Sequence, residues 1–189
     1  MLKGYRIGNY PKKALRGNKM YNHPKGFIKV TKDNRNLLLT PHFQLGQFLC
    51  KQRAEFPKYV VLREPLLFKL EYILEKVNQH SYKSNTLFIM SGYRTPYYNK
   101  KIGNVKYSRH VYGDAADIFV DGNNDGRMDD LNGDGKINFA DVMVLCNIVE
   151  KMESQKRFKQ YIGGMGKYKK NRSHSGFIHT DVRGYRARW

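Results

Sequence analysis

The order of the apolar patterns along the chain most constrains its fold. Thr40 and Pro41 suit the start of a helix, as N-cap and first helical residue, and we expect this helix to run to about residue 56. A second helix is expected from Glu64, because its apolar residues recur at spacings that share one face. These residues are Leu66, Leu70, Ile73, Leu74 and Val77. Two helices therefore precede most of the strand patterns.

Short apolar runs typical of buried strands follow these helices. They lie at residues 86–91, 115–120, 161–162 and 176–182, and a further helix is expected from Phe139. The first 40 residues are basic and rich in turn residues, with one short strand at 27–30. Helices first and a small set of strands later predict an α+β fold. The length favours one domain, residues 1–189, with an insertion at 121–141.

The chain is strongly basic, with 35 Lys and Arg against 16 Asp and Glu and a formal net charge of +19. Such a balance favours polyanionic partners, which include nucleic acid, anionic membranes and anionic cell-wall polymers. No charge-free apolar stretch approaches the ~18 residues that a membrane span needs. The first residues also lack the apolar run of a signal peptide, which leaves a cytoplasmic protein or a mature secreted form. Cys50 and Cys146 are too few for a disulfide framework and are expected to be buried thiols, although export would allow one disulfide.

Two histidines and an aspartate could form a zinc site. His110 and Asp117 are seven residues apart, and His179 follows 62 residues after Asp117. Two imidazoles and one carboxylate are a plausible zinc set, and three protein ligands leave the fourth tetrahedral position open to water, as in catalytic sites. On a strand at 176–182, His179 and Asp181 would share one face, where Asp181 could accept a proton or orient the ligand. The spacing alone is a weak signal, and surface histidines with a capping aspartate are the alternative interpretation.

The segment 121–141 contains the pattern of an EF-hand-type calcium loop. Oxygen-bearing residues alternate along it, a glycine stands where the loop must turn, and a helix follows at once. The expected ligands are Asp130, Asn132, Asp134, Lys136 through its carbonyl, Asn138 and Asp141. A second, overlapping pattern contains Asp121, Asn123 and Asp125, and predicts either shared ligands or a degenerate loop. The alternative is an acidic, turn-rich hairpin that binds no calcium, and this alternative is stronger for the second pattern than for the first.

Three motifs in a fixed order are much more specific than these spacings. The segments SGYRTP, SRHVYGDAADI and GFIHTDVRG, followed by ARW, resemble the zinc D-alanyl-D-alanine carboxypeptidases and related murein endopeptidases, in a compact branch with an EF-hand-like calcium loop insertion. The resemblance covers roughly residues 24–189. It implies a single zinc metallopeptidase domain with a Hedgehog/DD-peptidase-like fold, in which helices pack on one side of a small antiparallel sheet.

The resemblance also implies roles for individual residues. His110, Asp117 and His179 match the three zinc ligands of that family. Arg94 matches an arginine that stabilises the oxyanion or binds the substrate carboxylate, for which a bidentate guanidinium is suited; a structural ion pair is the alternative. Ser108 and Tyr93 are expected to bind substrate.

The general base is not fixed by these motifs. Some related branches have an acidic residue three positions before the last ligand, and others have a histidine two positions before it. Here those positions are Gly176 and Phe177. We therefore expect Asp181 to be the base, with His174 as the second candidate and Asp114 as the third.

The resemblance thus predicts a zinc peptidase that hydrolyses D-alanyl-linked amide bonds of peptidoglycan stem peptides. We expect zinc and calcium as cofactors, peptidoglycan as partner, a monomer, and a periplasmic, secreted or cell-wall location, with no nucleic-acid partner and no membrane span. One alternative is a catalytically silent zinc- and calcium-binding module of Hedgehog-like fold. A less favoured alternative is a basic nucleic-acid-binding protein, which the net charge of +19 would suit.

Overall fold

A five-stranded sheet is the central element of the structure, a computed structural model that describes residues 4–79 and 82–189. Its strand order is β5-β6-β8-β7-β9, and all pairs are antiparallel except β7 with β9. The strands are β5 (Phe88–Ser91), β6 (Ala115–Phe119), β7 (Gly164–Tyr168), β8 (Phe177–Asp181) and β9 (Ala187–Arg188). Two smaller antiparallel sheets pair β1 (Ile28–Val30) with β4 (Lys58–Val60), and β2 (Leu38–Thr40) with β3 (Phe43–Gln44).

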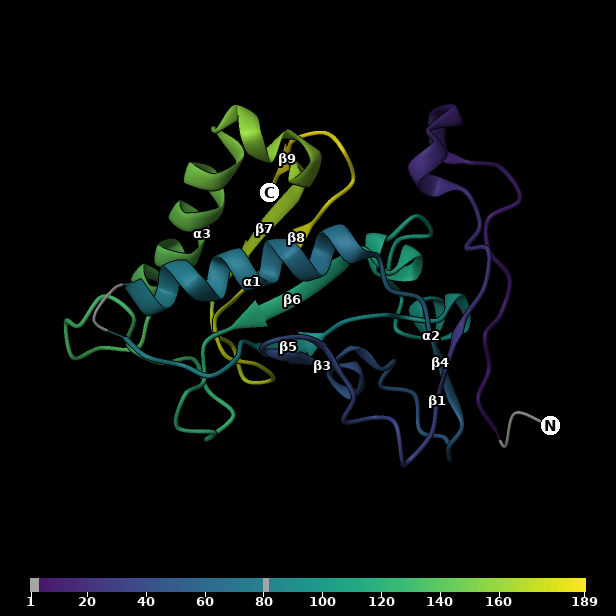
Figure 1. Ribbon diagram of the computed structural model, residues 1–189, viewed down its shortest axis with the longest axis horizontal. Coiled ribbons are helices and arrows are strands. Elements are labelled where there is room, and N and C mark those ends of the chain that lie inside the picture. The colour runs from purple at the N-terminus through teal and green to yellow at the C-terminus, as the bar shows by residue number, and fades with distance from the viewer. Residues whose placement is uncertain (1–3, 80–81) are drawn as a thin grey trace.

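The helices lie around this sheet. In Figure 1, α1 (Glu64–Gln79) runs across the front of the sheet, and α3 (Phe139–Glu153) lies beside α1 and β7. A shorter helix, α2 (Pro96–Lys101), follows β5, and its N-cap Thr95 accepts a hydrogen bond from the backbone of Tyr98. The 3-10 helices are η1 (Leu15–Gly17), η2 (Lys19–Tyr21), η3 (Leu45–Phe48), η4 (Arg109–Tyr112) and η5 (Lys156–Tyr161). The predicted α+β class is confirmed.

The predicted apolar face of α1 is confirmed. All five residues of the stripe are buried, and they join one core with the inner residues of the sheet and of α3. A buried charge also fixes this helix: Lys69 donates to Glu153 of α3 at 2.7 Å and to the carbonyl oxygen of Asp181 in β8 at 2.9 Å. The two helices and the sheet are therefore joined by polar contacts as well as by apolar packing.

The predicted helix at 41–56 is wrong. Residues 43–44 form strand β3, η3 covers only Leu45–Phe48, and the chain is irregular from there to β4. Tertiary hydrogen bonds take the groups that a helix would use: Gly46 donates its N–H to the carbonyl of Arg35, and the carbonyl of Phe48 accepts from Tyr93. The apolar residues of this stretch are buried from irregular backbone, so the helical start signal at Thr40 was overridden.

The remaining strand predictions were mostly confirmed. Strands β1, β5, β6 and β8 fall within or overlap the predicted ranges, and α3 begins at Phe139 as expected. The strand expected at 161–162 begins instead at Gly164, because η5 extends to Tyr161. Strand β7 contains Gly164 and Gly166, and glycine is poorly represented in strands, which weakened its signal in the sequence.

Within the described residues, no helix is both long and apolar enough to cross a membrane. Cys50 and Cys146 are both buried and unpaired, which confirms the expectation of buried thiols. The acidic segment follows β6 directly, and Figure 1 shows it looping away from the sheet before it enters α3.

Candidate metal centre

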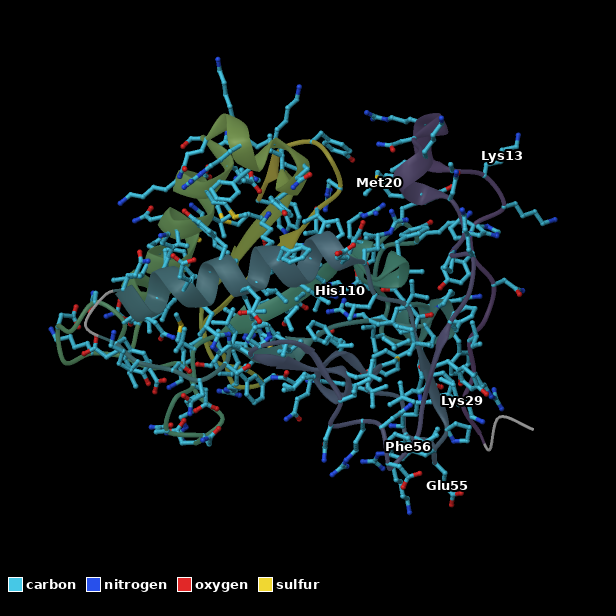
Figure 2. The ribbon with its side chains drawn as sticks, in the orientation of Figure 1. Lys13, Met20, Lys29, Glu55, Phe56 and His110 are labelled. Carbon is cyan, nitrogen blue, oxygen red and sulfur yellow. The ribbon has the colours of Figure 1, made fainter. Side chains whose placement is uncertain are left out.

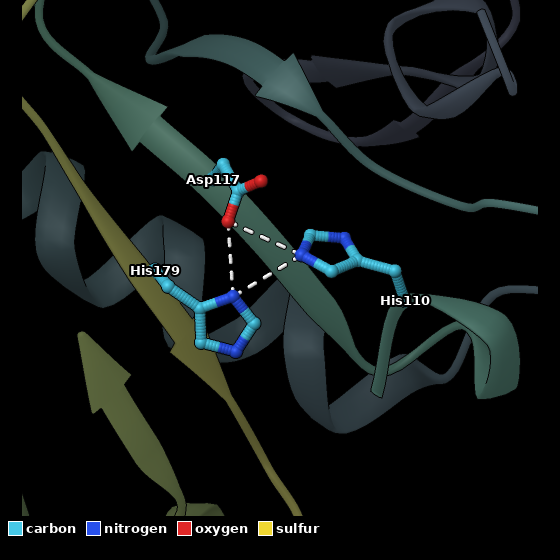
Figure 3. Close-up of side chains that lie close together, drawn as sticks. All are labelled: His110, Asp117 and His179. Carbon is cyan, nitrogen blue, oxygen red and sulfur yellow. Dashed lines mark hydrogen bonds and ion pairs between the residues drawn. The ribbon is translucent and has the colours of Figure 1, made fainter. Parts of the chain in front are cut away.

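The register of the sheet places Asp117 beside His179. Asp117 on β6 is the direct partner of His179 on the antiparallel strand β8. The Asp117 Oδ1 atom lies 2.9 Å from His179 Nδ1 and 3.1 Å from His110 Nε2, and the two imidazole nitrogens are 3.1 Å apart (Figure 3). Three side chains from distant parts of the sequence thus meet at one point, and all three are buried.

The short helix η4 carries His110 to this point. It ends at Gly113, whose φ of +72° lies in the left-handed region, and a Cβ there would stand 2.2 Å from the carbonyl oxygen of Val61. Only glycine fits such a close approach in this conformation. The Nδ1 atom of His110 lies 2.7 Å from the carbonyl oxygen of Gly92. Because a carbonyl only accepts, Nδ1 carries the proton, and the lone pair of Nε2 faces Asp117.

Asp181 fixes the other histidine in the same way. The Nε2 atom of His179 lies 3.1 Å from Asp181 Oδ2. The carboxylate accepts the Nε2 proton, so the lone pair of Nδ1 faces His110 and Asp117. Two imidazole lone pairs and one carboxylate oxygen therefore converge, and a cation between them would relieve their mutual repulsion.

The electrostatics favour the ligand-competent forms of His110 and Asp117, and the protonated form of His179. Burial lowers the pKa of His110, which keeps that imidazole neutral near pH 7. Burial alone would raise the pKa of Asp117, but the charges and hydrogen bonds of His110 and His179 outweigh it and hold the pKa far below its usual range. For His179, burial is outweighed by the hydrogen bonds to Asp117 and Asp181, which raise its pKa. A metal ion would take the place of that proton.

The donor set and its spacing fit zinc. Zinc bonds of about 2.0–2.2 Å to nitrogen and oxygen in a tetrahedron place neighbouring ligand atoms about 3.3–3.5 Å apart. The observed separations of 2.9–3.1 Å need only a small outward shift to reach that geometry. Three protein ligands leave one tetrahedral position for water or substrate, which is typical of catalytic zinc sites.

The surroundings of Asp181 do not favour its expected role as general base. Its side chain is fully buried, and Oδ1 accepts the backbone N–H groups of Gly164 and Arg183 at 2.8 and 3.0 Å. Oδ2 accepts from His179 and from the Arg183 guanidinium. Burial raises its pKa, but the hydrogen bonds from His179 and Arg183 outweigh burial and lower it. This geometry supports a role in orienting His179 rather than in taking a proton from water.

A cleft of about 680 Å³ opens onto the three converging residues. Arg94 and Ser108 line it, as their predicted roles require. The Nη2 atom of Arg94 donates to Asp117 Oδ2 at 2.5 Å, and its Nε atom donates to Ser91 at 2.8 Å. Arg94 therefore forms a structural ion pair, the alternative role considered for it from the sequence, and it also lines the cleft.

The other sequence-predicted residues lie outside the lining of the cleft. His174 forms a T-shaped contact with Phe177, which lines the cleft, and the Nδ1 atom of His174 lies 2.7 Å from the carbonyl oxygen of Ser175. Asp114 is buried in an ion pair with Arg109. Tyr93 lies in the core, with its hydroxyl 3.0 Å from that of Tyr10. These placements do not support the roles of His174 and Asp114 as a base, or of Tyr93 in substrate binding.

Several cleft residues were not singled out from the sequence. Trp189, Tyr168 and Arg183 line the cleft, and so do Leu15 and Tyr21 of the N-terminal segment. Trp189 belongs to the ARW segment, and Arg183 lies two residues after Asp181. Both could have been proposed from the sequence, because they lie in or beside the motifs described above. No pattern in the sequence pointed to the N-terminal segment.

The N-terminal segment is fixed against the rest of the site. The carbonyl of Met20, a residue labelled in Figure 2, accepts from the guanidinium groups of Arg63 at 3.3 Å and Arg109 at 3.0 Å. The Arg109 guanidinium lies over the ring of Tyr21, and the Tyr21 hydroxyl is 3.1 Å from that of Tyr185. This segment therefore forms a structured wall of the cleft.

The acidic segment holds its polar groups in internal hydrogen bonds. Asp130 accepts the backbone N–H groups of Gly133 and Gly135, and Asp121 accepts those of Asp125 and Gly126, so the bond from the glycine five residues later is common to both predicted patterns. The expected ligands Asn132, Asp134, Lys136 and Asn138 lie along the same loop, and Asn123 lies in the first one. Asp141 caps α3 together with Asn138. Among the described residues, His110, Asp117 and His179 are the group of His, Cys, Asp or Glu side chains gathered closely enough for a metal ion. Calcium binding stays a prediction.

Comparison with known proteins gave one finding. The sequence model of the peptidase M15 family matches residues 41–138, just over half of the chain. The matched stretch contains Arg94, Ser108, His110 and Asp117, and it ends before His179. Neither the curated proteins nor the solved structures gave a significant match.

Proposed function

This chain belongs to the peptidase M15 family, and we propose that it hydrolyses D-alanyl-linked amide bonds of peptidoglycan stem peptides, as a D,D-carboxypeptidase or a murein endopeptidase. Family membership indicates a zinc-dependent peptidase, and the His110–Asp117–His179 group is its candidate metal site. The peptidoglycan substrate, a Hedgehog/DD-peptidase-like fold type, a monomeric state and a periplasmic or extracellular location are parts of our proposal.

One observation carries the catalytic part of this proposal. Three ligand atoms with free lone pairs lie within 3.1 Å of one another beneath an open cleft of about 680 Å³. A zinc ion bound there would polarise the scissile carbonyl group and lower the pKa of water. The protein's own groups hold the imidazoles in the required tautomers through Gly92 and Asp181.

The cleft residues supply binding and charge stabilisation. Arg94 holds Asp117 and presents cationic charge at the cleft, which suits a developing oxyanion or a substrate carboxylate. Ser108 lines the same cleft and offers a hydroxyl for hydrogen bonding to substrate. Of the cationic side chains that line the cleft, Arg94, Arg109 and Arg183 pair with Asp117, Asp114 and Asp181. Lys106 lines the cleft as well, and its cationic charge is compatible with an anionic substrate such as a stem peptide, which carries carboxylates.

The decisive experiment digests purified murein and identifies the released fragments by mass. We expect the zinc-loaded wild type to release peptides cut at D-alanyl bonds, and His110→Ala to release none. A matched control is His42→Ala, which removes an exposed histidine that pairs with Glu71 outside the site. Fragments that retain every D-alanyl bond would contradict the proposed substrate.

Two other functions would give different results. A silent zinc- and calcium-binding module of Hedgehog-like fold would bind zinc tightly and release no fragments. A nucleic-acid-binding protein, which the net charge of +19 would suit, would bind DNA or RNA in a salt-sensitive manner. That binding would survive the loss of His110 and His179. The family match favours the peptidase.

Calcium binding by residues 121–141 is a separate proposal that rests on the order of oxygen-bearing residues in the sequence. The structure adds that Asp121 and Asp130 form equivalent turns. Calorimetric titration with calcium tests it, and Asp130→Ala, which removes the first ligand position, should abolish any heat of binding.

A further inference from the structure

Trp189 and Tyr168 form a hydrogen-bonded pair in the wall of the cleft, next to the candidate metal site. The indole Nε1 atom of Trp189 donates to the Tyr168 hydroxyl oxygen at 2.7 Å. The Trp189 ring also packs against the ring of His179, with centroids 5.2 Å apart. Both residues line the cleft. The pair therefore connects the cleft wall to a residue of the metal site.

The local backbone is built to admit this indole. Gly166 on β7 is the direct strand partner of His179. A Cβ at Gly166 would lie 2.4 Å from Trp189 Nε1, so any other residue there would displace the indole. The main chain of Trp189 is fixed as well, because its N–H donates to Met165 and its carbonyl accepts from Lys167. The position of the indole is thus determined by the sheet.

The Tyr168 ring is also held in place, by stacking on a neighbouring ring. It stacks face to face on Phe177, with centroids 4.4 Å apart and ring planes 6° apart. Its hydroxyl oxygen accepts the indole N–H of Trp189. Among the described residues, this hydroxyl has no other hydrogen-bond partner. Since a phenol can also donate, its proton is available to a group in the cleft.

The other tyrosines of the cleft differ from Tyr168 in this respect. Tyr107 donates its proton to the carbonyl oxygen of Lys13. Tyr21 and Tyr185 bond to each other where the N-terminal segment meets the loop after β8. Tyr168 alone among the four is joined through a hydrogen bond to a residue that packs on His179.

From this arrangement we propose that Tyr168 positions the substrate: its hydroxyl donates a hydrogen bond to an acceptor oxygen of the bound peptide, and Trp189 orients that hydroxyl. The inference rests on the proposed peptidase function and adds a substrate-binding residue to it. The acceptor is a carbonyl or carboxylate oxygen of a residue beside the scissile bond, because the pair lies on the β7 side of His179, and Asp117 lies on the other side, on β6. Trp189 acts through Tyr168 and is a positioning residue.

The test compares wild type with Tyr168→Phe, which removes one oxygen atom and keeps the ring stacked on Phe177. Loss of one hydrogen bond to substrate should raise KM about three- to tenfold, with little change in kcat and in zinc content measured by mass spectrometry. Tyr72→Phe is the matched control, because Tyr72 of α1 packs against Phe158 of η5 and does not line the cleft. Equal KM values for wild type and Tyr168→Phe would overturn the inference.

A second variant separates orientation from simple packing. Trp189→Phe keeps an aromatic ring but lacks the N–H, so it should raise KM in the wild-type background and add little in the Tyr168→Phe background. Fully additive effects would mean that Trp189 does not act through Tyr168.

The substrate in these assays is whichever mixture the wild type cleaves, a murein digest or a casein digest. Cleavage of casein peptides alone would contradict the proposed substrate while leaving the Tyr168 comparison valid. Trp189 is the one tryptophan of the chain, so its fluorescence reports occupancy of the cleft without hydrolysis. If the wild type cleaves neither mixture, a synthetic stem peptide is titrated instead. An unchanged Trp189 signal, or a response that is equal in Tyr168→Phe, would then overturn the inference.

Discussion

Replacing Asp181 by asparagine distinguishes the two roles that its position beside His179 allows: orienting that histidine, and acting as the general base. Both carboxylate oxygens of Asp181 face donors: two backbone N–H groups on one side, and His179 with the Arg183 guanidinium on the other. An amide NH₂ group would oppose donors in either orientation. If it faced His179, Nε2 would become the acceptor and Nδ1 would carry the proton, which blocks the lone pair needed for zinc.

The size of this effect follows from the surroundings. Loss of a carboxylate that orients a metal-binding histidine costs about 10–100-fold in metal affinity, which is about 1.4–2.8 kcal/mol. The zinc-free protein should lose about 3 kcal/mol of unfolding free energy, near the lower bound for breaking a buried ion pair, because Arg183 keeps some contact with solvent.

The assays are a zinc competition titration against a chromophoric chelator, urea unfolding of the zinc-free protein, and kcat at saturating zinc. Asp114→Asn is the matched control, since Asp114 is equally buried and paired with Arg109 but does not contact a histidine of the site. It should lose stability and retain most of its zinc affinity. If Asp181 were the general base, zinc-saturated Asp181→Asn would keep its zinc affinity and lose about 100-fold or more in kcat, which would refute the positioning role.

Three further predictions concern stability and reactivity. Lys69→Met removes the buried partner of Glu153. It should lower the free energy of unfolding by about 3 kcal/mol, which a thermal unfolding experiment would show as a fall in Tm of about 6–12 °C. Cys50 and Cys146 should react with a thiol reagent near pH 8 only after unfolding, because both are buried and burial raises the pKa of Cys146 to about 11. Glu150 has its pKa lowered to about 2 by hydrogen bonds from two arginines, so it stabilises the fold above its unfolded pKa of about 4.3. That contribution should be lost as the pH falls from there towards 2, and Glu150→Gln should show a weaker acid dependence of Tm.

The elements that could be predicted from sequence are those whose signal is local. The stripe of α1 predicted a buried face, and the apolar pattern that begins at Phe139 predicted the start of α3. The helix expected at 41–56 failed because its backbone groups bond to Arg35 and Tyr93, outside the predicted helix. Arg35 precedes it and Tyr93 lies 45 residues after Phe48, so the apolar pattern of residues 41–56 contains neither partner.

The candidate site also has a part that the sequence predicted and a part that it did not. His110, Asp117 and His179 could be proposed from motif order, and the structure brings them together through the β6–β8 register. The environment of Asp181 could not be read from its position alone, because His179 and Arg183 are close in sequence but the N–H of Gly164 comes from strand β7, 17 residues away. Whether a carboxylate accepts a proton from water or holds a histidine depends on such neighbours.

The attachment of the N-terminal segment has a practical consequence. Leu15 and Tyr21 border the cleft, and the carbonyl of Met20 is held by two guanidinium groups from other parts of the chain. Proteolytic trimming or a fused affinity tag near residue 20 would therefore reshape the substrate entrance while leaving His110, Asp117 and His179 in place. Preparations that differ only at this terminus should differ in which peptides they accept, even when they contain equal amounts of metal.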